Sequence, residues 1–212
     1  ITFSRTWDGD ALGSALAMFA LLKKMDKKVD IAADRLAENK AYAFLPAYEA
    51  ITDQLGDVNK FVISLDTTNA QVEKIKYRSG DHTLDFIIYP KDGNFTPDDV
   101  SCRTGEFTYD LVITVNTPDL ESLGELYDQN TEFFYHVPII NIDHHTHNEA
   151  YGQINLVELT AVATSEIVFN LITQHSRDLV DEDVATCLLT GIIAKTRSFK
   201  TQNITPQALA VS

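Results

Sequence analysis

Short apolar segments alternate with amphipathic ones along this 212-residue chain, and this alternation constrains the fold more than any other feature. Residues 1–6 and 29–33 have the pattern of strands, and residues 11–25, between them, place apolar side chains at helical spacing. Two more apolar strands are expected at 109–116 and 138–142. Strands that alternate with helices predict an α/β fold with a doubly wound, mostly parallel sheet.

Further helical patterns fit the same architecture. They are expected at 41–55, 118–128, 161–175 and 181–195, and residues 198–209 are expected to form a loop that opens another helix. Pro46 interrupts the first of these helices, because proline disfavours helical backbone in the residue before it. The chain contains no internal repeat and no low-complexity tract.

The stretch from about 57 to 108 departs from this pattern. Segments 59–66, 71–78 and 83–90 are rich in β-branched and aromatic residues, and an SGD turn separates the last two. They predict an antiparallel β-ribbon inserted into the α/β frame. The ribbon carries more apolar surface than a solvated hairpin needs, so residues 59–90 are expected either to form a homodimer or to pack on their own domain.

Charge and composition exclude several classes of function. Seventeen Lys and Arg against 31 Asp and Glu give a net charge of −14, so binding to nucleic acid through bulk charge is not expected. No apolar run reaches about 18 residues, so no membrane span is expected. Cys102 and Cys187 form neither a metal knuckle nor a disulfide framework, and no signal peptide opens the chain, so a reducing cytoplasm is expected.

Acidic and imidazole side chains follow two of the apolar strands. Asp8 and Asp10 flank a glycine in WDGDALGS, and a turn can aim both carboxylates at a hard divalent cation, although Asp10 can equally cap the helix that follows. Asp143, His144 and His145 come directly after PIINI, where imidazole serves as a metal ligand or acid/base group, or completes a turn. Open α/β sheets bind ligands at the carboxyl ends of their strands, so both groups are candidate site residues.

A third candidate lies at the end of the last long helix, where GIIAKTRSF brings Lys195 and Arg197 together. These cations either complement the negative end of the helix or bind an anion. Asp66 also follows an apolar strand, but ribbon comes after it, so an ordinary turn aspartate is expected there. The remaining histidines share no spacing and are expected on the surface: His82, His136, His147 and His175. No serine elbow and no glycine-rich phosphate loop with a lysine is present.

Five motifs occur in a fixed order along almost the whole chain. They are DGDALGS at 8–14, YDLVITVNTPDLESLG at 109–124, NIDHHTHNEAYG at 141–152, ATSEI at 163–167 and LLTGIIAKTRSF at 188–199. With them the chain resembles the DHH family of phosphoesterases, which includes RecJ-type exonucleases, nano-RNases, nucleoside 3′,5′-bisphosphate phosphatases and family II pyrophosphatases. The resemblance implies one α/β DHH domain over residues 1–212, and the family's smaller C-terminal substrate-binding domain is not expected within them.

The resemblance also implies a site. In the family, two Mn²⁺ or Mg²⁺ ions share a bridging carboxylate and activate a water molecule. Asp8 and Asp10 match the family's acidic pair, and His144 matches its ligand imidazole. His145 matches the histidine that contacts the phosphate, and Asp143 would orient the cluster through hydrogen bonds, so these two are the implied catalytic residues.

Three positions depart from the family's ligand set. Its first histidine is replaced by Ser4, its bridging aspartate by Asn116 and its last aspartate by Lys195. Opposite unit charges roughly 4 Å apart attract by about 4 kcal/mol at an effective dielectric near 20, so the Lys195 ammonium is expected to take over the role of one cation. We therefore expect a weakened site in which Mn or Mg is weakly bound or absent, and a phosphate site formed by His145, Lys195 and Arg197.

Three functions remain open at this stage. The first is a phosphoesterase-like domain that has lost two-metal hydrolysis and keeps a pocket for a phosphorylated small molecule or a short oligonucleotide. The second is an active phosphoesterase that uses one metal ion held by Asp8, Asp10 and His144. The third is an interaction module whose working surface is the ribbon. If the site is buried, Lys195→Ala is expected to destabilise the domain by about 3–5 kcal/mol.

Overall fold

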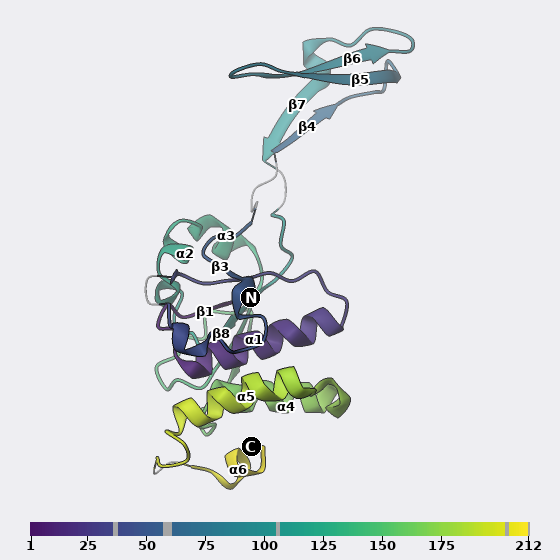
Figure 1. The fold of residues 1–212 in the computed structure, drawn as a ribbon. Helices are drawn as coiled ribbons and strands as arrows, with labels where there is room; N and C mark the ends of the chain where they lie inside the picture. The colour runs from purple at the N-terminus through teal and green to yellow at the C-terminus, as the bar shows by residue number, and fades with distance from the viewer. Residues whose placement is uncertain (36–37, 57–60, 105–106, 202–203, 212) are drawn as a thin grey trace. The chain divides into compact units, whose positions relative to one another are not determined.

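The computed structural model describes residues 1–35, 38–56, 61–104, 107–201 and 204–211. The chain divides into two compact units, both drawn in Figure 1. The first, here called the main body, comprises Ile1–Val58 and Tyr109–Ser212. The second, here called the insert, comprises Asn59–Thr108.

The main body is built on a six-stranded sheet in which every pair of neighbouring strands is parallel. The strands are β1 (Thr2–Phe3), β2 (Ile31–Ala32), β3 (Ile51–Thr52), β8 (Val112–Val115), β9 (Ile139–Asp143) and β10 (Ile154–Val157). Their order across the sheet is β10-β9-β8-β1-β2-β3. After β1, the chain adds β2 and β3 on one side of that strand, and it later adds β8, β9 and β10 on the other side. The predicted α/β fold with a mostly parallel sheet is confirmed, and the strand order reverses between β1 and β8.

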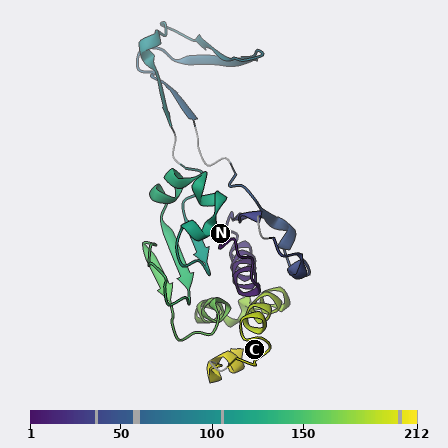
Figure 2. The same ribbon diagram turned by 90° about the vertical axis from the view of Figure 1, so that its left-hand side faces the viewer.

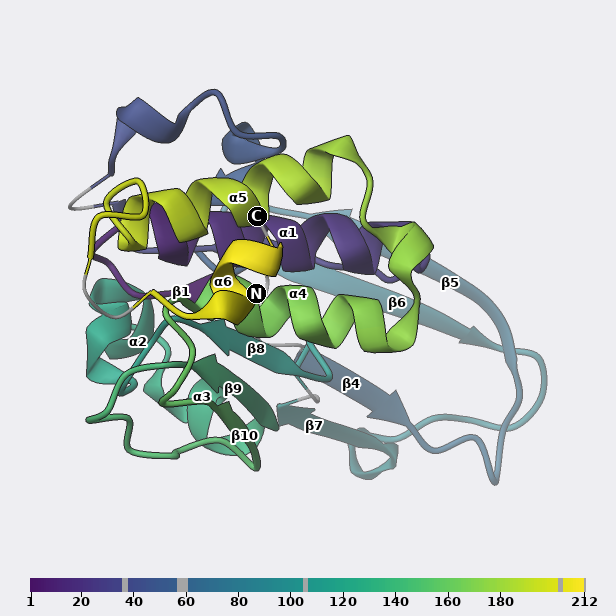
Figure 3. The same cartoon turned by 90° about the horizontal axis from the view of Figure 1, so that it is seen from below.

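Three long helices pack against one another beside this sheet: α1 (Gly9–Lys24), α4 (Thr164–His175) and α5 (Glu182–Lys195) (Figures 2 and 3). They confirm three of the helices expected from the apolar spacing. Their side chains share one core with Phe3 of β1 and Val115 of β8, both fully buried. Removal of this apolar surface from water is the main driving force that holds the helices on the sheet.

Shorter helices complete the main body. They are α2 (Glu125–Asp128), α3 (Thr131–His136) and α6 (Pro206–Val211), with a 3-10 turn, η5, at Glu121–Leu123. Together, η5 and α2 replace the single helix expected over 118–128, because Gly124 has a φ of 65° and separates them. Among the helices of the described residues, none is both long and apolar enough to cross a lipid bilayer.

The helix expected over 41–55 is wrong. In its place are two 3-10 turns, η2 (Lys40–Tyr42) and η3 (Tyr48–Ala50), followed by β3. Ala47 has left-handed backbone, with a φ of 62°, directly after Pro46, and this conformation prevents one continuous α-helix through the segment. The buried Tyr48 ring packs edge-on against Trp7, with ring centroids 5.9 Å apart, so tertiary packing outweighs local helix propensity.

The insert holds two antiparallel strand pairs. β4 (Phe61–Leu65) pairs with β7 (Val100–Thr104), and β5 (Val72–Ser79) pairs with β6 (Leu84–Pro90). The predicted antiparallel character is confirmed. The first ribbon segment pairs with an additional strand, β7, that the pattern analysis does not predict. Residues 59 and 60 of that expected segment lie outside the described residues.

Candidate active site

The residues singled out in the sequence gather at the carboxyl edge of the main-body sheet. Asp8 and Asp10 lie between β1 and the first turn of α1, and Asn116 follows β8 directly. Asp143 ends β9, and His144 comes next. These segments flank the point where the strand order reverses, which is where open α/β sheets place their ligands.

Asp10 is a fully buried carboxylate that caps the amino end of α4. Its Oδ2 accepts a hydrogen bond from the Thr164 backbone N–H at 2.7 Å, and its Oδ1 accepts from the Ser165 N–H at 2.9 Å and the Ser165 hydroxyl at 2.8 Å. The helix has no capping side chain of its own, so Asp10 satisfies its first donors and meets the positive end of its dipole. Burial raises the pKa of Asp10, and the hydrogen bonds from Ser165 and Thr164 oppose that rise.

A glycine in α5 makes room for this contact. A Cβ at Gly191 would collide with the Ser165 hydroxyl and would lie 3.1 Å from Asp10 Oδ1. The helix can therefore approach the Asp10 carboxylate only because this position has no side chain. The motifs at 163–167 and 188–199 thus both surround the Asp10 carboxylate. This role cannot be predicted from their sequence alone.

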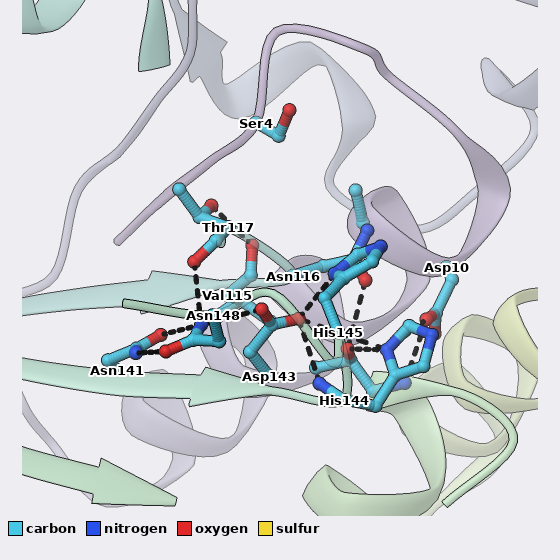
Figure 4. A network of polar contacts seen from close by, with 12 residues as sticks. Ser4, Asp10, Val115, Asn116, Thr117, Asn141, Asp143, His144, His145 and Asn148 are labelled. Atoms are coloured by element: carbon cyan, nitrogen blue, oxygen red, sulfur yellow. Dashed lines mark hydrogen bonds and ion pairs between the residues drawn. The ribbon is translucent and has the colours of Figure 1, made fainter. Parts of the chain in front are cut away.

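Asp143 is the second fully buried carboxylate, and it organises the loop that follows β9 (Figure 4). Its Oδ1 accepts from the His144 backbone N–H at 2.8 Å and lies 2.7 Å from His145 Nδ1, while its Oδ2 accepts from Asn148 Nδ2 at 2.6 Å. Burial opposes ionisation of Asp143, but the hydrogen bonds from His145, Asn148 and His144 prevail and lower its pKa. Asn148 also donates to the Thr117 carbonyl, which connects this loop to the end of β8.

Asn116 occupies the centre of the site, although sequence comparison marks it only as a substituted ligand position. It is buried and has left-handed backbone, with a φ of 52°, which asparagine tolerates better than most residues. Its Nδ2 donates to Asp8 Oδ1 at 3.4 Å, and its Oδ1 accepts from the Thr164 hydroxyl at 2.9 Å. The amide therefore connects the start of α1 to the start of α4.

The same chain of hydrogen bonds assigns the proton on His144. Thr164 has one hydroxyl hydrogen and donates it to Asn116, so it accepts at its oxygen from His144 Nδ1, 2.8 Å away. His144 therefore carries its proton on Nδ1 and leaves the Nε2 lone pair free. Burial first, and the positive charge of Lys195 second, lower the pKa of His144 to about 4, so the ring is neutral at pH 7.

Lys195 and Asp8 form the exposed side of the site. Lys195 Nζ lies 4.0 Å from Asp8 Oδ2, and the two side chains are 29% and 43% exposed. The expected ion pair with the acidic segment is present, but it is not buried. Asp8 also caps α1, since its Oδ1 accepts from the Ala11 N–H at 2.8 Å. Ser4 is buried, and its hydroxyl accepts hydrogen bonds of 3.4 Å from Thr6.

The remaining candidates divide between the site and the surface. His145 stacks at 4.5 Å from the His144 ring and at 5.3 Å from the His147 ring. His82, His136, His147 and His175 are all exposed, as expected. Asp66 accepts from the backbone and hydroxyl of Thr68, so it is the turn residue that the sequence predicts. Arg197 is exposed at the turn after α5.

Among the residues that the structure describes, the ligand atoms of Asp143, His144 and His145 all lie within 4.8 Å of one another, a spacing that could hold a metal ion. A separate cavity of about 470 Å³ lies elsewhere in the main body. Its lining includes Thr2, Thr52 and Phe133, and none of the predicted site residues. The chemistry-bearing residues therefore surround an open edge of the sheet and not this cavity.

Comparison with known proteins matches the chain to a family and to related proteins. The model of the DHH family, N-terminal domain, matches residues 1–192. The bifunctional oligoribonuclease and PAP phosphatase NrnA of Thermus thermophilus is 38% identical over 74 residues, which are 35% of this chain and 22% of the relative. An exopolyphosphatase-related protein from Bacteroides fragilis matches 99% of this chain with a TM-score of 0.65 and 17% identity, and 49% of that protein is covered.

The chain thus spans about half of the Bacteroides protein, and its alignment covers about a fifth of the Thermus one. The Bacteroides structure has the same fold as this chain. The family model covers Asp8, Asn116, Asp143 and most of α5, and it ends at residue 192, three residues before Lys195. The chain therefore belongs to the DHH family of phosphoesterases.

Proposed function

We propose that the main body binds a phosphorylated small molecule or the end of a short oligonucleotide, and that it does so without two-metal hydrolysis. The observation that carries the proposal is the surroundings of Asp8. This carboxylate faces the Asn116 amide N–H on one oxygen and the Lys195 ammonium on the other. With the Ala11 backbone N–H included, three nitrogen donors of the chain itself thus meet its negative charge.

The donor set does not fit two divalent cations. Asp8 and Asp10 are the carboxylates at the matching positions, and the Lys195 ammonium offsets one of their charges. Asp10 already accepts three hydrogen bonds at the start of α4. The Asn116 oxygen is neutral and already accepts from Thr164, and its nitrogen, which has no lone pair for a metal, faces Asp8, so this amide is a weaker bridge between two ions than a carboxylate.

The same residues suit an anion. His145 and Lys195 are partly exposed on the side of the site that solvent reaches, and Arg197 is exposed nearby in sequence. An ammonium, a guanidinium and an imidazole are the side chains that bind phosphate oxygens by charge-assisted hydrogen bonds. The name of the Thermus relative, an oligoribonuclease and PAP phosphatase, suggests the ligand class.

A second candidate is a phosphoesterase that works with a single Mn²⁺ or Mg²⁺ ion. It is favoured by one observation: the neutral His144 ring, whose Nε2 is free, lies beside the Asp10 carboxylate, with its protonated Nδ1 3.7 Å from Asp10 Oδ2. When bound, such an ion would lower the pKa of a coordinated water. Asp8, Asp10 and His144 would hold it.

The test compares binding with turnover. Inorganic phosphate and a 5′-phosphorylated dinucleotide are titrated by calorimetry in the presence of EDTA, with Lys195→Ala as the variant and Lys200→Ala as its exposed matched control. We expect binding by the parent and by Lys200→Ala, and a loss of about tenfold in affinity for Lys195→Ala.

Hydrolysis of bis-p-nitrophenyl phosphate and of short oligonucleotides is then measured with and without Mn²⁺. The proposal predicts no metal-dependent turnover above the background of an Asp10→Ala variant. Turnover that needs Mn²⁺ and disappears in His144→Ala would instead establish the one-ion enzyme. Absence of phosphate binding under all conditions would contradict both.

A further inference from the structure

Apolar side chains are exposed mainly on the insert. It is less than a quarter of the chain, yet it holds half of the large hydrophobic side chains that the described residues expose. On the β5–β6 ribbon the exposed fractions are 60% for Ile75, 76% for Tyr77, 55% for Leu84 and 52% for Phe86. Single exposed hydrophobics are ordinary, but a contiguous group of this kind marks an interaction surface.

The ribbon separates its side chains into two faces. In the register of β5 and β6, Ile75 lies opposite Ile88, Tyr77 opposite Phe86 and Ser79 opposite Leu84. Since side chains alternate along a strand, these six residues share one face, here called the apolar ribbon face. It contains no charged residue, and Ser79 is its one polar member.

The other face of the ribbon carries the charges. Arg78 forms a salt bridge of 2.8 Å with Asp85 across the strands, and Lys76 Nζ lies 5.6 Å from the centre of the Tyr89 ring. The third cation of this face is Lys74, which lies opposite Tyr89. A strand of nucleic acid needs cations beside its stacking surface, and the apolar ribbon face itself has none, so this arrangement favours a protein partner.

We propose that the apolar ribbon face joins two copies of this chain. A two-stranded ribbon is marginally stable unless something covers one face, and in the described residues β5 and β6 pair only with each other. A second copy offers a face of the same shape without charge, so Tyr77 and Phe86 of one chain meet the same pair in a two-fold contact.

The distribution of charge supports this occupant. The insert carries six basic and eight acidic residues, whereas the main body carries 11 and 23. The net charge is thus −2 on the insert and −12 on the main body, so a contact through the insert brings the less negative part of each chain together. The proposal is independent of the phosphate site, because no residue of that site lies on the ribbon.

Disulfide trapping tests the contact directly. In a Cys102→Ser background, which removes the exposed native thiol, Tyr77→Cys is compared with Lys76→Cys, its neighbour on the opposite face. We expect mild oxidation to convert most of the Tyr77→Cys protein to a covalent dimer and to leave Lys76→Cys monomeric. Equal cross-linking of the two variants, or none in Tyr77→Cys, would overturn the proposal.

Sedimentation velocity provides the second measurement. The parent is expected to show a concentration-dependent dimer, and the double variant Tyr77→Thr/Phe86→Thr is expected to raise its dissociation constant at least about tenfold. Tyr89→Thr, on the charged face, serves as the matched control and should leave the constant unchanged. A parent that stays monomeric at high concentration would mean that its own chain covers the face.

A labelled single-stranded oligonucleotide is titrated into the same proteins. Binding that the double variant loses would assign the apolar ribbon face to nucleic acid and contradict the dimer. Unfolding of the main body by urea should be the same in all variants, which separates loss of association from loss of the fold.

Discussion

The acidic side chains of the site differ sharply in their surroundings. Asp10 and Asp143 are fully buried, and both oxygens of each accept hydrogen bonds from neighbouring backbone or side-chain groups. Asp8 is 43% exposed, and besides capping α1 it faces the Asn116 amide and the Lys195 ammonium.

Within one site, the buried carboxylates stabilise the fold, whereas the exposed carboxylate faces the side where a ligand would bind. Asp10 joins α1 to α4, and Asp143 joins β9 to its loop, so both carboxylates are part of the framework of the fold. Asp8 lies beside Asn116 and Lys195, whose side chains supply a hydrogen-bond donor and a positive charge from the chain. Under the proposed function, the buried carboxylates keep the framework of the site, and the charge at its open side comes from the chain and not from ions.

The largest expected effect comes from exchanging a framework carboxylate for an amide. Asp10→Asn replaces an acceptor oxygen by an NH₂ group that faces N–H donors of α4, and we expect the free energy of unfolding to fall by about 2–4 kcal/mol. Asp8→Asn is the matched control, because asparagine also caps a helix, and should cost less than about 1 kcal/mol. Urea denaturation measures both. Equal losses of stability in the two variants would contradict the distinction between the buried Asp10 and the exposed Asp8.

The free energy of unfolding, measured as a function of pH, tests the burial of His144 beside these carboxylates. Its pKa is about 4 in the folded chain and its ordinary value is 6.5, so the unfolded chain binds more protons between these values. The free energy of unfolding should fall by about 2–3 kcal/mol as the pH drops from 6.5 to 4. The raised pKa of Asp10 acts in the opposite direction at the acid end, so the parent is measured against His144→Asn. A parallel pH dependence of the two proteins would show that His144 is not buried as described.

Lys195→Ala should have a small effect on stability. The 3–5 kcal/mol expected for a buried pair does not apply, because both partners are partly exposed and 4.0 Å apart. We expect a loss of about 1 kcal/mol or less in urea denaturation, alongside the loss of phosphate affinity described above. A loss of 3 kcal/mol or more would place the ammonium in a closed, desolvated site.

The smallest effect is expected at the turn after α5. Arg197 has a φ of 49°, a left-handed conformation that costs a residue with a Cβ about 1 kcal/mol or more. Arg197→Gly should therefore raise the free energy of unfolding by about 0.5 kcal/mol after the added flexibility of the unfolded chain is counted. Arg197→Ala keeps the strain and should be neutral, and a gain in that variant too would point to the guanidinium and not to the backbone.

The sequence predicts those parts of the fold whose pattern is long and regular. The helices α1, α4 and α5 follow from apolar spacing, and the meeting of Asp8, Asn116 and Asp143 at one sheet edge follows from parallel strands. Strand β10, whose INLV pairs with β9, is too short and too exposed to be recognised by periodicity. The left-handed Ala47 is set by tertiary packing that no local window contains.

The sequence predicts which residues form the site, but not which hydrogen bonds connect them. The roles of Thr164, Asn148 and Gly191 depend on which helix end or loop meets which carboxylate, and spacing along the chain carries no such information. The exposure of Lys195 depends on how closely the last turns of α5 approach the start of α1. The sequence predicts its ion pair with the acidic segment, and only the fold decides how much water reaches it.

Stoichiometry of Mn²⁺ binding, measured by isothermal titration calorimetry at pH 7, tests the central claim most directly. The parent should bind fewer than two ions per chain, because Asn116 and Lys195 stand at positions where an ion needs oxygen ligands. Ser4→His/Asn116→Asp/Lys195→Asp, which restores the three replaced ligand types, should bind two. A parent that binds two Mn²⁺ ions per chain with the same affinity as this variant would contradict the account.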